Sequence, residues 1–198
     1  YANMGFYALI GDGNNTNDNG NSANQVRGGI QISGSNVILK FNGDWWESYT
    51  LPQEYADAFA AGTLRIGFGR GQGVFFLAAG IDDGSGECGM TRFVNLVLLT
   101  SDITKNAIDE LHMFNNGTAQ VTLSRILFET GEDVPEIGRV TFNGEADSEM
   151  PIGRTDTENY NVAANEDFFI SGRVEGLLLD TSGNDVGERW LGFSVWQA

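Results

Sequence analysis

The sequence predicts an all-β fold, either an antiparallel β-sandwich or a partly closed barrel, with about ten strands and two short helices. Apolar and polar residues alternate in many short runs, as half-buried strands require. In the run at 63–69, Leu64, Ile66 and Phe68 fall on one face of the expected strand. Clusters of Gly, Asn and Asp separate the runs and indicate turns. Because the 198 residues contain no Pro-rich linker, we expect a single β-domain over residues 1–198.

The expected strands cover most of the chain. In order, they are residues 4–10, 26–33, 36–42, 63–69, 74–79, 92–99, 118–128, 137–143, 168–179 and 189–196. The last two are expected to pair as a hairpin. The final strand places Phe193 on one face and Trp190 and Trp196 on the other. Aromatic residues on both faces predict that both faces are covered.

Two helices are expected between the strands. Thr50 can cap a first helix at 51–61, with Gln53 completing a capping box and Gly62 ending the helix. A second helix is expected at 102–114 from apolar residues at helical spacing. This apolar stripe consists of Ile103, Ala107, Leu111 and Phe114. Both helices would pack against a sheet.

The charge balance disfavours several classes of partner. The chain has 27 Asp and Glu against 11 Lys and Arg, a formal net charge of −16. A charge of this sign repels phosphate groups and anionic lipid, so we expect no specific nucleic-acid binding. No apolar run approaches the roughly 20 residues that cross a bilayer, so we expect no membrane partner. An acidic, lysine-poor surface suits a saline environment, where salt screens the repulsion between carboxylates.

Reactive side chains are scarce in this sequence. His112 is the single histidine and Cys88 is the single cysteine. Zinc, thiol and Ser-His mechanisms need several such groups in one place, so we expect a protein that is not an enzyme and has no cofactor. Two carboxylates at a suitable separation are sufficient for glycoside hydrolysis. A carboxylate-dependent glycoside hydrolase therefore stays open as a third function.

Two long loops are expected, at residues 11–25 and 144–167. The first carries oxygen-bearing side chains at spacings that suit calcium. Its candidate ligands are Asp12, Asn15, Asn17 and Asn19. Val26 stands where an EF-hand has its bidentate Glu, so the calcium pattern is incomplete. A polar loop explains the same residues. Asp82, Asp83 and Glu87 form another oxygen cluster, which a tight turn explains equally well.

Glycine occupies every second position from residue 67 to residue 73. On one face of an extended segment such a run leaves a strip without side chains, where a backbone, an aromatic ring or a neighbouring subunit can approach closely. A glycine loop between two strands is the alternative. We predict an assembly surface that combines this strip with the tryptophans of the last strand. Its residues are Gly67, Gly69, Gly71, Gly73, Trp190 and Trp196.

Aromatic residues also gather in a second place. Trp45, Trp46 and Tyr49 can form a flat platform on which sugar rings stack. Adjacent residues of an extended segment face opposite sides, so at most one of the two tryptophans joins such a platform. The other tryptophan is then expected to pack in the core.

These observations favour a structural protein. We predict a non-enzymatic subunit of a virion or an extracellular assembly, such as a phage head-decoration or tail-tube type protein or a β-rich surface filament. Its partners would be copies of itself or neighbouring structural subunits. The alternative function is a carbohydrate-binding module or lectin that uses the exposed tryptophans, with calcium as a further ligand.

Overall fold

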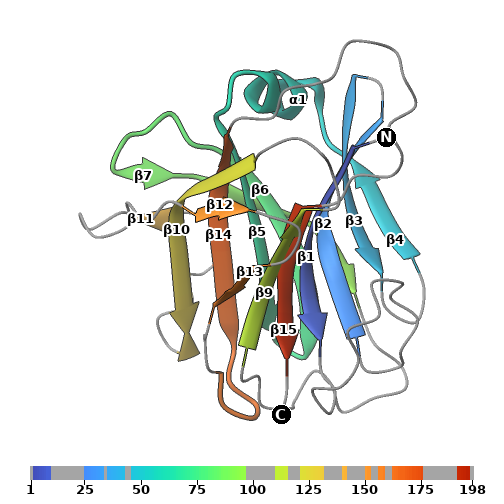
Figure 1. Ribbon diagram of the computed structural model, residues 1–198, viewed down its shortest axis with the longest axis vertical. Helices are drawn as coiled ribbons and strands as arrows, with labels where there is room; N and C mark the ends of the chain where they lie inside the picture. The colour runs from blue at the N-terminus through green and yellow to red at the C-terminus, as the bar shows by residue number, and fades with distance from the viewer. Residues whose placement is uncertain are drawn as a thin grey trace.

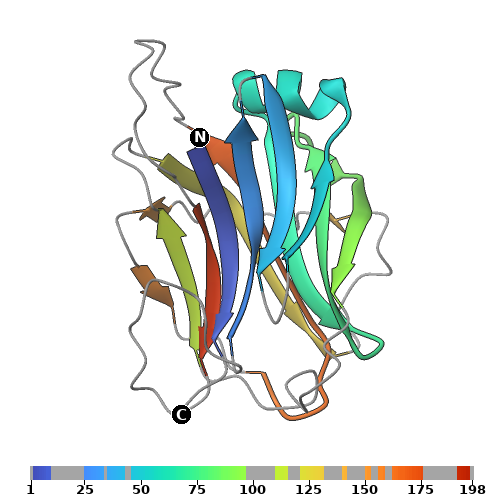
Figure 2. The ribbon, with the colours of Figure 1, turned by 90° about the vertical axis from the view of Figure 1, so that its right-hand side faces the viewer.

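The computed structural model describes residues 2–9, 25–33, 35–42, 46–96, 110–115, 121–131, 140–141, 150–152, 156–158, 162–175 and 191–196. Within these ranges two antiparallel sheets face each other and a single helix lies at one end (Figures 1 and 2). The prediction of an antiparallel all-β fold is confirmed. The two sheets form an open sandwich and not a closed barrel.

The described strands belong to three sheets. Sheet A has the order β1 (Ala2–Leu9), β9 (Glu110–Asn115), β15 (Leu191–Trp196), β2 (Gln25–Ser33), β3 (Asn36–Asn42) and β4 (Trp46–Thr50), with β13 (Asp156–Glu158) paired to β9 and a further pairing of β1 with β2. Sheet B has the order β12 (Met150–Ile152), β10 (Val121–Thr130), β14 (Phe168–Glu175), β5 (Leu64–Gly71), β6 (Val74–Ile81) and β8 (Met90–Leu96). Sheet C pairs β7 (Glu87–Cys88) with β11 (Val140–Thr141).

The main hydrophobic core lies between sheets A and B. Phe68 of β5 is central to it, with its ring centroid 6.1 Å from that of Phe41, 5.6 Å from that of Phe75 and 5.6 Å from that of Phe168. All four side chains are fully buried. Phe41 belongs to sheet A and the other three to sheet B, so these rings join the two sheets. Burial of this much aromatic surface is a major source of stability.

The two sheets approach each other closely at Gly28 of β2. A Cβ atom there would lie 2.7 Å from Cε1 of Phe41 and 2.9 Å from Cδ2 of Leu77, a residue of sheet B. Only glycine leaves room for both side chains at this position. The backbone of β2 is therefore part of the packed interface between the sheets.

A second cluster covers the outer face of sheet B. Phe76 and Phe169 stack with their centroids 5.8 Å apart, and the guanidinium of Arg92 lies 4.4 Å from the Phe76 centroid. Every residue of β5 is buried as a result. The expectation of a half-buried strand at 63–69 is wrong, because this strand is covered on both faces.

Helix α1 (Gln53–Ala60) packs Tyr55 and Phe59 against the core. Its predicted end is confirmed, because Gly62 follows the helix with a φ of +70°. Its predicted cap is wrong. Thr50 ends strand β4, and Pro52 takes the N-cap position without a side-chain hydrogen bond.

Two predicted elements are replaced by others. Residues 110–115 form strand β9, so the C-terminal part of the expected helix at 102–114 is wrong, and residues 101–109 lie outside the described ranges. Pairing of β9 with strands of sheet A overrides the helical spacing of its apolar residues. The expected hairpin of the last two strands is also wrong, because β14 belongs to sheet B and β15 to sheet A.

The two expected long loops have different outcomes. The loop at 144–167 contains the short strands β12 and β13. Residues 11–24 lie outside the described ranges, and Gln25 already belongs to β2. Short strands β4, β7 and β9 are further elements that the prediction lacks. In the part of the chain that the structure describes, no helix is both long and apolar enough to cross a membrane.

Candidate functional site

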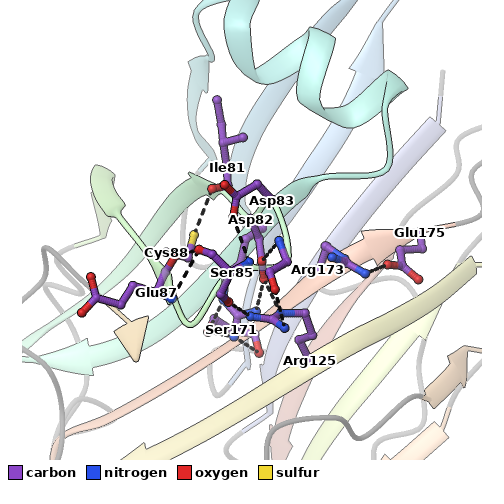
Figure 3. A network of polar contacts seen from close by, with 12 residues as sticks. Ile81, Asp82, Asp83, Ser85, Glu87, Cys88, Arg125, Ser171, Arg173 and Glu175 are labelled. Atoms are coloured by element: carbon purple, nitrogen blue, oxygen red, sulfur yellow. Dashed lines mark hydrogen bonds and ion pairs between the residues drawn. The ribbon is translucent and has the colours of Figure 1, made fainter. Parts of the chain in front are cut away.

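Asp82 is the centre of a buried network of charges that follows β6 (Figure 3). Its side chain is fully buried. Oδ2 accepts hydrogen bonds from Nη1 of Arg65 at 3.1 Å and from Nε of Arg125 at 3.0 Å. Oδ1 accepts the backbone N–H of Gly84 at 3.0 Å. One carboxylate thus faces two guanidinium groups, which come from strands β5 and β10.

Arg65 is fully buried and is held by Ser171 of β14 as well as by Asp82. Its Nε and Nη2 donate to the Ser171 hydroxyl at 3.1 Å and 2.8 Å, and Nη2 also donates to the Ser171 carbonyl at 3.4 Å. Burial lowers the pKa of Arg65 to about 10, although the Asp82 charge opposes this shift. The guanidinium therefore stays charged near neutral pH, and a buried charge of this kind needs an opposite charge beside it.

Arg125 joins the network to the turn that follows β6. It has a φ of +51° and lies where the register of β10 with β14 shifts, a local irregularity that redirects a side chain. Its Nη1 donates to the Gly84 carbonyl at 3.4 Å, and its Nη2 donates to the Ser85 carbonyl. The network therefore fastens β5, β6, β10 and β14 to one turn. This arrangement suits a structural anchor on the outer face of sheet B.

Cys88 of β7 lies beside this anchor. Its thiol donates to the Ile81 carbonyl, with a Sγ to oxygen distance of 3.4 Å (Figure 3). Burial raises the pKa of Cys88 to about 11. A buried thiol that keeps its proton is a poor nucleophile.

We expect Cys88 to resist alkylation in the folded protein. The rise of its pKa from 9.0 to about 11 leaves about 100-fold less thiolate near pH 8 than an ordinary cysteine has. Iodoacetamide labelling followed by mass spectrometry should show slow modification in buffer and complete modification in urea. Equal labelling rates in both solutions would contradict the buried position.

A second buried guanidinium fastens the segment 162–167 to sheet B. Nε and Nη2 of Arg70 donate to the Glu166 carbonyl at 3.1 Å and 2.6 Å, and Nη2 also donates to the Ala163 carbonyl at 3.2 Å. The guanidinium lies 5.8 Å from the ring centroid of Phe168. Burial lowers the pKa of Arg70 to about 10. Backbone carbonyl oxygens thus accept the hydrogen bonds of this cation.

The glycine run receives aromatic rings of the same chain at two positions. A Cβ atom at Gly67 would lie 2.5 Å from Cζ of Phe169. One at Gly69 would lie 2.4 Å from Cζ of Phe76 and 2.6 Å from the carbonyl oxygen of Phe168. The close approach that these two glycines allow is therefore made within the chain, and a neighbouring subunit finds their outer face already covered.

The other members of the predicted assembly surface lie apart. Gly71 is buried at the end of β5. Gly73 and Gln72, with φ values of +76° and +53°, form the two-residue turn between β5 and β6. The backbone of Trp196 is part of strand β15, and Trp190 lies outside the described residues.

Of the three residues of the predicted sugar platform, Tyr49 is the one whose side chain the structure describes. Tyr49 of β4 is 42% exposed, and its ring stacks on Phe93 with the centroids 5.2 Å apart. The backbone of Trp46 is part of strand β4, and Trp45 lies outside the described residues. The exposed aromatic surface at this edge of sheet A is thus a tyrosine that the sandwich itself supports.

The predicted calcium ligands Asp12, Asn15, Asn17 and Asn19 lie outside the described residues. Among the residues that the structure describes, no three His, Cys, Asp or Glu side chains are grouped as a metal site would need. In the other predicted oxygen cluster, two of the carboxylates contact groups of the protein itself. Asp82 binds two arginines, while exposed Asp83 accepts the backbone N–H of Ser85 at 2.9 Å, which lowers the pKa of Asp83.

The first and last strands that the structure describes pair with the same partners. β1 and β15 are each antiparallel to both β2 and β9, and Figures 1 and 2 show them side by side. Met4 of β1 and Leu191 of β15 are both opposite Ile30 of β2 and Asn115 of β9. We call this position, between Gly28–Ile30 of β2 and 113–115 of β9, the β2–β9 site.

The two strands also resemble each other in sequence at the β2–β9 site. β1 reads Met-Gly-Phe from residue 4, and β15 reads Leu-Gly-Phe from residue 191. In both strands the glycine is opposite Gly29 and the phenylalanine is opposite Gly28. Neither strand contains a charged residue, although the chain as a whole is strongly acidic. Two similar uncharged strands thus match one position.

One position in a sheet accommodates one strand. The edge of a strand offers a single row of N–H and C=O groups, which one neighbour satisfies. In the described ranges β2 also pairs with β3, so its other edge is the one that faces the β2–β9 site. No ladder joins β1 to β15 among the described strands. In this structure both β1 and β15 lie at the β2–β9 site, although the facing edges of β2 and β9 have backbone partners for one strand.

Comparison of the chain with protein-family models, with curated proteins and with solved structures gives no match.

Proposed function

We propose that this protein is a non-enzymatic structural subunit that assembles with copies of itself in a virion or an extracellular filament. The observation that carries the proposal is that two terminal strands match one β2–β9 site. Each molecule then has one uncharged strand more than this site accommodates. Such a strand, with backbone groups that need partners, favours pairing with a neighbouring chain.

The buried charges support the same proposal. Arg65, Arg70 and Asp82 are enclosed in contacts that hold strands and turns together. Contacts that join several strands of sheet B would help a subunit to bear load in an assembly. Burial lowers the pKa of each of the two arginines to about 10. Both guanidinium groups therefore keep their protons near neutral pH, and neither serves as a base there.

The acidic surface sets the condition for assembly. Subunits with a formal charge of −16 repel each other in dilute buffer. Salt shortens the range of this repulsion, from a Debye length of about 30 Å at 0.01 M to about 3 Å at 1 M. Assembly through uncharged strands should therefore strengthen as salt is added.

Sedimentation velocity of the purified protein tests this function. We expect species larger than the 21.4 kDa chain, and their share should rise with protein concentration and with sodium chloride. Electron microscopy of the same samples should show rings, lattices or fibres. A single 21.4 kDa species at every concentration and salt level would contradict the proposed function.

A further inference from the structure

The β2–β9 site makes a particular mode of assembly possible, and this inference rests on the proposed function. We propose that β1 fills the site in the free subunit, and that β15 of a second copy fills it in the assembly, with β1 displaced. The partner is thus a second copy of this chain, and the contact is the addition of a strand to a sheet. The observations behind it are the common registers and the common Gly-Phe sequence of the two strands.

The registers show how the two strands differ as occupants. Along β2, all of Ala2–Leu9 is paired, whereas β15 is paired only over 191–193. Along β9 the relation is reversed, because all of Leu191–Trp196 is paired but only residues 4–7 of β1. β1 is thus paired over more of its length with β2, and β15 with β9. Neither strand is paired over its full length with both β2 and β9, so each leaves backbone groups that the other strand could satisfy.

The order of the strands in the chain indicates which one belongs to the free subunit. Among the described strands β1 is followed by β2, so their pairing is close in sequence and forms readily within one molecule. β15 follows β14, which belongs to the opposite sheet. Residues 176–190 connect these two strands, and a connection of this length extends to at most about 50 Å. A compact domain of this size has a radius of gyration of about 16 Å. The connection is therefore long enough for β15 to reach the site of an adjacent copy.

Exchange of β15 between copies can join many subunits into one assembly. Every subunit has one β2–β9 site and one β15, so each copy fills the site of the next and receives a strand from the one before. A head-to-tail contact of this kind gives rings when the rotation closes and filaments when it does not. The length of the assembly is then limited by subunit supply and not by symmetry.

Single cysteines in the full-length chain test which strand is exchanged. His112 of β9 is opposite both Tyr7 of β1 and Ser194 of β15, and residues directly opposite each other are close enough for a disulfide after a small adjustment. In a Cys88→Ser background, chains with His112→Cys are mixed with chains carrying Ser194→Cys, assembled in salt and oxidised. We expect the 21.4 kDa band to shift to a band of twice that mass on a non-reducing gel. The matched mixture of His112→Cys with Tyr7→Cys chains should stay at the single-chain mass.

The remaining outcomes are distinguishable. A chain with both Tyr7→Cys and His112→Cys should form its disulfide within one molecule before assembly. If the Tyr7→Cys mixture links copies and the Ser194→Cys mixture does not, the assignment of β15 as the exchanged strand is overturned. If particles assemble without either link, strand exchange is overturned while the proposed function stands. If no particles form under any condition, the proposed function itself fails.

Discussion

Replacing Asp82 with Asn should destabilise the protein by about 3–5 kcal/mol, because the substitution leaves buried cations without their carboxylate. Arg65 is fully buried and donates to the Asp82 carboxylate at 3.1 Å. Arg125, whose side chain is 14% exposed, donates to the same oxygen. An amide in place of the carboxylate keeps the shape of the side chain and removes the charge. The loss is therefore electrostatic in origin.

Urea unfolding followed by circular dichroism measures this effect as a lower midpoint with an unchanged slope. Asp83→Asn is the matched control, since the neighbouring carboxylate is exposed and should leave the midpoint nearly unchanged. The double variant Arg65→Met/Asp82→Asn should be more stable than Asp82→Asn, because it removes the fully buried cation as well. An Asp82→Asn protein with the midpoint of the parent would show that the network does not anchor sheet B.

Gly69→Ala should cost about 1–3 kcal/mol through overpacking. The added Cβ would lie 2.4 Å from Cζ of Phe76, a ring that can shift, and 2.6 Å from the carbonyl oxygen of Phe168, which belongs to a paired strand. The carbonyl cannot move without disturbing the ladder between β5 and β14. The effect on stability should therefore persist even if the Phe76 ring adjusts.

Gly86→Ala is the control for this substitution, because a Cβ at Gly86 meets nothing within 4 Å. Its stability should equal or slightly exceed that of the parent, as alanine restricts the unfolded chain. Urea midpoints and sedimentation velocity should be measured on both variants. If Gly69→Ala abolished assembly and left the midpoint unchanged, the glycine run would be an intermolecular surface and our account of its packing would be wrong.

Much of the fold was accessible from alternation in the sequence. The run at 63–69 predicted strand β5, and Gly62 predicted the end of α1. The prediction failed where distant strands decide the outcome. Residues 110–115 have apolar residues at a helical spacing, yet they form β9 because strands of sheet A lie beside them. Burial of the second face of β5 likewise depends on Phe76 and Phe169, which come from neighbouring strands.

The candidate site was less accessible. Arg65 and Asp82 lie 17 residues apart on a hairpin, but Ser171 and Arg125 reach them from elsewhere in the chain. The sequence therefore suggested only an oxygen cluster or a tight turn at Asp82. The likeness of Met-Gly-Phe at residue 4 to Leu-Gly-Phe at residue 191 is visible in the sequence. Its meaning depends on the register, which places both glycines opposite Gly29.

A density map of the assembled protein from electron cryomicroscopy tests the central claim most directly. At the β2–β9 site, the account predicts one strand whose connecting chain runs from β14 of the adjacent subunit. A map in which every site holds β1 or β15 of the same chain would contradict strand exchange between copies.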